Sequence, residues 1–210
     1  MKTIKKTIKK CVLSSAVALA LASSASFAEE NGAFVGVGVG YGGSQIKPAG
    51  SEKMDLNGIS YEIIAGYKQF FTPSFGLRYY ANFAYADASG KPKDSSEKIK
   101  GNVMDYGVNV DALYNFVTGG TDFGAFLGLG LGANTWGGKS FKDAKLDKTG
   151  FNLALNVGLR SVIAQNHGIE IAARVPFIAT TLQKADAATG TSKMTGSHTY
   201  NVGVRYIFSF

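Results

Sequence analysis

The feature that most constrains this chain is a two-residue alternation of apolar and polar side chains, which recurs eight times. In the last of these stretches, apolar residues stand at every second position from Tyr200 to Phe210, and mostly small or polar residues lie between them. A period of two is typical of a β-strand that has one apolar and one polar face. The apolar face of this stretch ends in three aromatics, the final residue among them, which favours a strand in contact with lipid.

The ionised side chains support the same interpretation. The alternating stretches cover residues 32–41, 58–69, 74–86, 103–116, 122–135, 150–161, 168–177 and 198–210. The ionised residues within them all fall on the face opposite the apolar one: Glu62, Lys68, Arg78, Asp105, Asp111, Asp122, Arg160, Glu170, Arg174 and Arg205. An Arg or Lys that faces the middle of a bilayer costs about 2–4 kcal/mol, so a lipid-facing wall requires this segregation. A soluble β-sandwich also separates its faces, but it turns the apolar face inward. We predict an all-β fold, an eight-stranded antiparallel up-and-down transmembrane β-barrel.

The N-terminus is typical of a secretory signal peptide. A lysine-rich start precedes an apolar run from Val12 to Ala22 and the small-residue end Ser26-Phe27-Ala28. The run is shorter than the ~20 residues that a membrane helix needs. We therefore predict a cleaved signal peptide at 1–28 and an outer-membrane β-barrel at 29–210. Cys11 is the only cysteine, so the mature protein is expected to have neither disulfides nor a thiol nucleophile.

The formal net charge of +7 is largely a property of that signal peptide. Residues 1–28 hold five lysines and no acids, which leaves 17 basic and 15 acidic residues, about +2, in the rest of the chain. A nucleic-acid partner, which a high pI would otherwise suggest, is therefore not expected.

Short and long connections between the stretches alternate. Short ones are predicted at 70–73, 117–121 and 164–167, and long ones at 42–57, 87–102, 136–149 and 178–197. In outer-membrane barrels the short turns face the periplasm, so we expect periplasmic termini and extracellular long loops. Pro176 cannot donate to a sheet ladder, and regular pairing is expected to fail near it.

The charges on the polar face are expected to pair inside the barrel. The interior of an eight-stranded barrel is just wide enough for side chains to fill, and an unpaired buried charge is costly. All four arginines lie on this face, as suits buried bidentate pairs. We predict an interior charge network, a polar and salt-bridged plug without a wide aqueous channel. Its members are Glu62, Lys68, Arg78, Asp105, Asp111, Arg160, Glu170, Arg174 and Arg205. A small porin is the alternative.

Two glycine-rich runs lie 92 positions apart and look alike, Gly32 to Gly40 and Gly124 to Gly132. A duplicated four-strand unit explains the likeness, and so does the restricted residue alphabet of barrel strands. A nucleotide-binding loop needs a strand before its glycines and a helix after them, whereas these glycines alternate within a strand. We expect them to make room for large lumen neighbours, and we expect no cofactor.

Support for catalysis is thin. His167 is predicted in a turn and His198 at the outer rim, beside Ser197 and Thr199. Some outer-membrane lipid-modifying enzymes place a Ser/His site near that rim. No acidic residue is obviously placed to orient the imidazole, so a rim histidine that is solvated or part of the strand ladder is the favoured interpretation, and no catalytic or metal site is predicted.

Lysines dominate the basic residues of the predicted long loops. Twelve of them accompany eight acids, which leaves these loops about +4. A solvated mixed-charge surface is the simpler interpretation of this balance. The functional one is contact with lipopolysaccharide phosphates or with an anionic host surface.

The two ends of the predicted barrel resemble a known family. Glu30 to Tyr41, His167 to Phe177 and the terminal stretch are together similar to the Helicobacter-type outer-membrane protein family. The resemblance implies a surface-exposed barrel, sometimes an adhesin and sometimes a porin. The long cysteine-bearing domain of the larger adhesins has no counterpart here. Alternating aromatics that end on Phe also resemble the C-terminal signal read by the barrel assembly machinery, with Tyr206, Phe208 and Phe210 as the expected assembly residues.

Overall fold

The computed structural model describes residues 31–50, 52–91, 98–119, 121–141, 146–186, 190 and 192–210. The predicted signal peptide and Cys11 lie outside the described residues. Within them, no helix is both long enough and apolar enough to cross a membrane.

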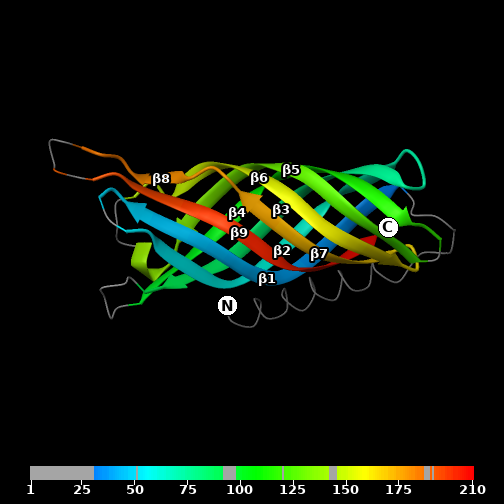
Figure 1. Ribbon diagram of the computed structural model, residues 1–210, viewed down its shortest axis with the longest axis horizontal. Coiled ribbons are helices and arrows are strands. Elements are labelled where there is room, and N and C mark those ends of the chain that lie inside the picture. The colour runs from blue at the N-terminus through cyan, green and yellow to red at the C-terminus, as the bar shows by residue number, and fades with distance from the viewer. Residues whose placement is uncertain are drawn as a thin grey trace, which may run out of the picture.

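Eight long strands form one closed antiparallel barrel, as Figure 1 shows. Each strand pairs with its neighbour in sequence, and β9 pairs with β1 to close the wall. The barrel strands are β1 (Gly32–Pro48), β2 (Met54–Phe70), β3 (Phe75–Gly90), β4 (Ile99–Val117), β5 (Thr121–Gly137), β6 (Thr149–Ile163), β7 (His167–Pro176) and β9 (Met194–Ser209). The predicted eight-stranded antiparallel barrel is confirmed.

The outer face of the wall carries the predicted apolar residues. Each strand turns aliphatic or aromatic side chains outward near its middle, for example Val37, Ile63, Phe83, Val108, Leu129, Leu155, Ile171 and Val204. Aromatics border this band near both ends of the strands, as in barrels that span membranes. The outward aromatics at one end include Tyr41, Tyr106, Phe151, Phe177 and Tyr200, and those at the other include Phe75, Tyr114, Phe116, Tyr206 and Phe210.

The two ends of the barrel differ in their connections. At one end, links of three or four residues join β2 to β3, β4 to β5 and β6 to β7, and both described chain ends lie there. We call this the turn end. The other end, the loop end, carries the links after β1, β3, β5 and β7. The β6–β7 turn is tight because Ala164 and Gln165 adopt positive φ angles of 49° and 67°.

The loop-end strands extend further than the sequence pattern predicted. β1 continues for seven residues beyond its predicted end at Tyr41, and β4 begins four residues before its predicted start at Val103. Past the aromatic band the outer face meets water, so outward residues need not be apolar and the alternation that identified the strands fades. At about 3.3 Å per residue, the extension of β1 alone adds roughly 20 Å of strand.

A short strand and a helical turn occupy the loop end. β8 (Thr180–Gln183) pairs only with β9, within the stretch that was predicted as a long loop. β7 ends at Pro176, where pairing was expected to fail. The 3-10 helix η2 (Lys139–Phe141) follows β5.

An irregularity in β9 changes the direction in which the side chain of His198 points. Gly43 of β1 pairs with Tyr200, but the next residue, Ser44, pairs with His198, so Thr199 is an extra residue on β9. A bulge of this kind shifts the alternation by one. His198 therefore points into the lumen and is 3% exposed. The prediction of a solvated residue is wrong, whereas the alternative, a residue of the strand ladder, agrees with its pairing with Ser44.

Candidate functional site

The barrel lumen holds the ionised side chains of the strands. All ten of the residues predicted to face inward are buried: Glu62, Lys68, Arg78, Asp105, Asp111, Asp122, Arg160, Glu170, Arg174 and Arg205. They come from seven different strands, because inward positions recur at every second residue of each strand.

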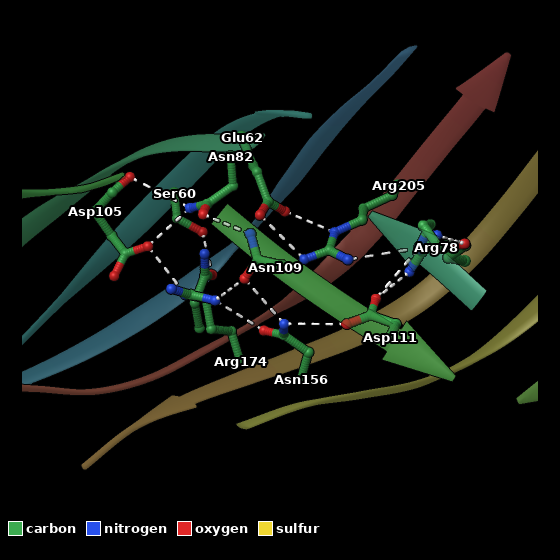
Figure 2. Close-up of polar contacts among 12 residues, drawn as sticks. Ser60, Glu62, Arg78, Asn82, Asp105, Asn109, Asp111, Asn156, Arg174 and Arg205 are labelled. Carbon is green, nitrogen blue, oxygen red and sulfur yellow. Dashed lines mark hydrogen bonds and ion pairs between the residues drawn. The ribbon is translucent and has the colours of Figure 1, made fainter. Parts of the chain in front are cut away.

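Five of these residues form one chain of ion pairs across the lumen, shown in Figure 2. Arg205 pairs with Glu62 through two nitrogens, at 2.6 and 3.0 Å. Its third nitrogen lies 3.7 Å from Glu170. Arg78 forms an ion pair with Glu170 at 2.5 Å and a second one with Asp111 at 2.7 Å. Acid and base alternate along this chain, so each arginine lies between two carboxylates.

Asparagine side chains connect that chain to a second ion pair nearer the loop end (Figure 2). Asn156 donates to Asp111 and to Asn109, and Asn109 donates to Asn82 at 2.9 Å. Asn82 donates to Asp105 at 2.8 Å, and the same carboxylate pairs with Arg174 at 3.0 Å. The network is therefore continuous, as it must be if polar groups in a water-poor space are to be satisfied.

Aromatic rings surround Arg78 on the turn-end side of the network. Its guanidinium carbon lies 5.7, 5.0 and 4.7 Å from the ring centroids of Phe34, Tyr80 and Phe126. These distances permit cation–π attraction, which is stronger where the cation is desolvated. Ile64 and Ile207 pack beside Phe34 and Tyr80, also on inward positions.

An apolar cluster closes the lumen at the loop end. Its buried members are Ile46, Leu56, Ala88, Val103, Trp136, Phe141 and Leu182, and Met54, Ile99, Leu146 and Met194 pack against them. We call this cluster the cap. The prediction of a polar plug is therefore incomplete, because apolar side chains fill the lumen on both sides of the polar network.

Little empty space remains between these layers. One lumen cavity beside Glu62 and Arg205 and another beside Arg78 and Glu170 measure about 10 Å³ each. A cavity needs about 10–15 Å³ to hold a single water molecule. Neither cavity offers a continuous aqueous path.

The remaining predicted charges lie toward the turn end. Asp122 accepts a hydrogen bond from the backbone of Gly119 at 2.9 Å, so it caps the β4–β5 turn. Arg160 donates to Asn115 at 2.8 Å and lies over the ring of Phe70.

The three predicted assembly residues do not share one environment. Tyr206 and Phe210 are exposed on the outer face, whereas Phe208 is buried at 5% exposure. The rings of His167 and Phe210 both pack edge-on against Phe208. Their centroids lie 5.4 and 5.2 Å, respectively, from that of Phe208. The His167 Nδ1 also lies 2.6 Å from the Tyr206 hydroxyl.

The two histidines do not meet. His198 is inside the barrel, with its Nδ1 3.0 Å from the Ser44 hydroxyl, and His167 is at the turn end. Within the described ranges, no group of three His, Cys, Asp or Glu side chains could hold a metal ion.

The asparagines of the network were not predicted as site residues. Asn82, Asn109 and Asn156 stand on the same inward positions as the charges, so the alternation alone could have identified them. The cap could not be found in this way. Leu56, Trp136 and Leu182 lie in stretches where the alternation had faded and loops were expected.

A closed barrel with a lipid-facing outer wall and a filled lumen defines the class of this protein, a bacterial outer-membrane β-barrel protein. The sequence model of the Helicobacter outer membrane protein family matches residues 62–210, and the chain belongs to this family. This confirms the predicted family, and the match includes His167 to Phe177 and the terminal stretch but not Glu30 to Tyr41. A search of curated proteins finds no match.

Several solved outer-membrane barrels have a similar fold. Neisserial surface protein A is 16% identical, with a TM-score of 0.50 over 87% of this chain and 100% of that one. OprG of Pseudomonas aeruginosa is 17% identical, with a TM-score of 0.48 over 86% and 98%. The attachment invasion locus protein Ail of Yersinia pestis is 17% identical, with a TM-score of 0.37 over 84% and 99%. At these identities the likeness to the Neisserial protein shows the fold alone.

Proposed function

We propose that this protein is a non-conducting outer-membrane barrel that holds a surface-interaction platform at its loop end. The filled lumen is the observation that supports a non-conducting barrel. The cap, the polar network and the aromatic layer around Arg78 lie in series, and the two lumen cavities measure about 10 Å³ each. A hydrated ion needs a continuous path, so three filled layers oppose a porin role.

Single-channel recording in planar bilayers tests this half of the proposal. The purified chain should insert without producing open steps of stable size. A large porin reconstituted in parallel shows that the bilayer can report conductance. Reproducible steps from this chain would favour the small-porin alternative and overturn the proposed closed barrel.

The second half of the proposal rests on the shape and charge of the loop end. Strand ladders continue past the outer aromatic band, so the described lysines there lie in a strand or the 3-10 helix (Lys47, Lys100 and Lys139) or directly beside a strand end. The described loop end carries nine lysines (Lys47, Lys53, Lys91, Lys98, Lys100, Lys139, Lys148, Lys184 and Lys193). Five acids accompany them (Glu52, Asp55, Asp87, Asp147 and Asp186), so the balance is +4. The partner that suits such a surface is an anionic polymer or a phosphorylated glycolipid.

Two of these lysines offer a sharp test. Lys47 and Lys193 lie on neighbouring chain segments, since Pro48 pairs with Met194 and the backbone of Ala49 donates to Lys193 at 2.7 Å. Changing both to Gln should lower the salt concentration that elutes the protein from immobilised heparin, because fewer counterions are displaced.

The matched control changes the charge in the opposite direction. Asp55→Asn removes an acid from the same end and should raise the eluting salt concentration. If neither change moved elution, the lysine surface would be only a solvated one. Catalysis is not proposed: the contact between Ser44 and His198 is buried in the lumen.

A further inference from the structure

The positive charge of the loop end is unevenly distributed around the barrel. The stretches that follow β3 and β5 (87–102 and 136–149) hold eight lysines and five acids, a balance of +3. Those that follow β1 and β7 (42–57 and 178–197) hold four lysines and three acids, a balance of +1. Because β4 lies between β3 and β5, most of the excess charge is near β4 and little of it is near β1 and β9.

Lysines gather on the outer side of the wall where β4 begins. Lys91 and Lys98 flank the pair of Gly90 and Ile99, at which the ladder between β3 and β4 ends. The Ile99 side chain packs against the cap, so Lys98 and Lys100 lie on the opposite, outer side. These lysines are exposed, and with one lysine of η2 they form what we call the basic corner (Lys91, Lys98, Lys100 and Lys139).

The helix η2 is held against β4, which fixes the position of Lys139 in the basic corner. The backbone amide of Lys100 donates to the Ser140 hydroxyl at 3.1 Å. Gly138 has a φ of 101°, and a methyl group added to it would lie 2.7 Å from the Cα of Gly101. The last residue of η2 belongs to the cap. Lys139 therefore lies beside β4 on a turn that is anchored at both ends.

The basic corner holds like charges close together. Adjacent strands lie about 4.8 Å apart, and like charges that face each other across a ladder are destabilising. None of the four lysines forms an ion pair with another described residue. The described acid on this part of β3, Asp87, pairs with Asn102 and accepts a hydrogen bond from the Tyr85 hydroxyl at 3.4 Å. An anion of high charge density over the corner would relieve the repulsion.

The basic corner stands clear of the membrane surface. Lys100 lies six residues beyond Tyr106, an outward aromatic of the loop-end band. At about 3.3 Å per residue and a strand tilt of about 40°, this places Lys100 roughly 15 Å above the band. Lipid head groups lie at the level of the band, so their phosphates do not reach the corner, whereas a glycan outside the membrane does.

We propose that the basic corner is the main binding site of the loop end, and that its ligand is a glycan with clustered sulfate or phosphate groups. This inference rests on the surface-interaction role proposed above and adds the place and the class of ligand. A lysine acts as a point charge and has no planar fork, so it accommodates sulfate and phosphate alike. Several lysines in one place favour sugars that carry more than one such group over sugars with a single carboxylate.

A short ligand tests the basic corner separately from the whole loop end. The protein in phospholipid nanodiscs is titrated calorimetrically with a fully sulfated heparin tetrasaccharide, which covers the corner but not the whole rim. Saturable binding is expected. Lys98→Gln with Lys100→Gln should weaken the affinity about ten- to thirtyfold and lower the salt dependence of log Kd by one to two counterions. Lys47→Gln with Lys193→Gln removes the same charge across the barrel and should weaken it less than about twofold, because salt screens distant charges.

The outcomes separate this inference from the proposed function. Binding to immobilised heparin without binding of the tetrasaccharide, or equal losses in the two double variants, would overturn the basic corner and leave the surface-interaction role intact. Equal binding of the desulfated tetrasaccharide would overturn the assignment to sulfate or phosphate. Competition by lipid A added to the nanodisc would overturn a ligand outside the membrane. If neither heparin form bound, the surface-interaction role itself would be contradicted.

Discussion

At Arg78, one side chain meets two carboxylates and three aromatic rings. Replacing it with Leu would leave Asp111 and Glu170 with less compensation inside the barrel. Removing one partner of a buried ion pair costs about 3–5 kcal/mol. We predict that Arg78→Leu lowers the free energy of unfolding by about this amount, measured by urea titration in phospholipid vesicles.

Two comparison variants make the Arg78 prediction specific. Arg78→Lys keeps the charge but loses the planar fork, so its free energy of unfolding should lie between those of Arg78→Leu and the natural chain. Lys91→Leu, at the exposed loop end, should change the free energy of unfolding by less than about 0.5 kcal/mol. A stability of Arg78→Leu equal to that of Lys91→Leu would contradict the role assigned to the ion-pair chain.

His198 shows what alternation could not predict at the scale of a residue. A strict period of two puts its side chain on the outer face with Tyr200, whereas the extra residue Thr199 turns it inward to Ser44. A bulge is set by how β9 fits against β1, and the period of two does not reveal its position. By contrast, the inward direction of Arg205 and Glu62 follows from the period alone.

Among the elements, β9 carries the clearest prediction. Phe210 donates its backbone amide to Ala33 at 2.9 Å, and its ring contacts Phe208. Deleting it removes the last closing bond between β9 and β1 and uncovers Phe208, which packs on His167. We predict that the Phe210 deletion strongly reduces the amount of protein inserted in the outer membrane, measured by fractionation of cells.

Phe116→Ala is the matched control for that deletion. Phe116 is also an exposed aromatic of the turn end, but it lies within β4 and not at the closing strand. Its loss should affect insertion only slightly. Comparable insertion of the Phe210 deletion and the natural chain would show that the terminal aromatic is not an assembly signal.

The strand pattern was predictable wherever lipid lies outside. There, one face must be apolar and the other must hold the charges, so the number of strands and the closure of the last strand against the first follow from the sequence, while the structure supplies the register that pairs Val35 with Phe208. Above the aromatic band, water replaces lipid and this constraint disappears. For that reason the strand extensions, the four-residue β8 and the apolar cap were missed.

Along the whole molecule, successive layers of side chains fill the lumen, and this arrangement can be tested. The cap lies at the loop end and the ion-pair chain lies beneath it, so either layer alone should block ions. We predict that Trp136→Ala with Leu182→Ala, which thins the cap, leaves the barrel non-conducting in planar bilayers. A variant with alanine throughout the ion-pair chain (Glu62, Arg78, Asp111, Glu170 and Arg205) should also be non-conducting, because the cap remains.

Only the combination of both sets with Phe34→Ala and Tyr80→Ala should produce open steps, because it alone thins all three successive layers of side chains in a lumen that eight strands otherwise keep just filled. Urea titration of each variant checks that the barrel still folds before conductance is compared. If thinning the cap by itself opened a stable pore, the polar network would be permeable to ions. The closed state would then depend on a single apolar layer at the loop end, with the ion pairs contributing to stability alone.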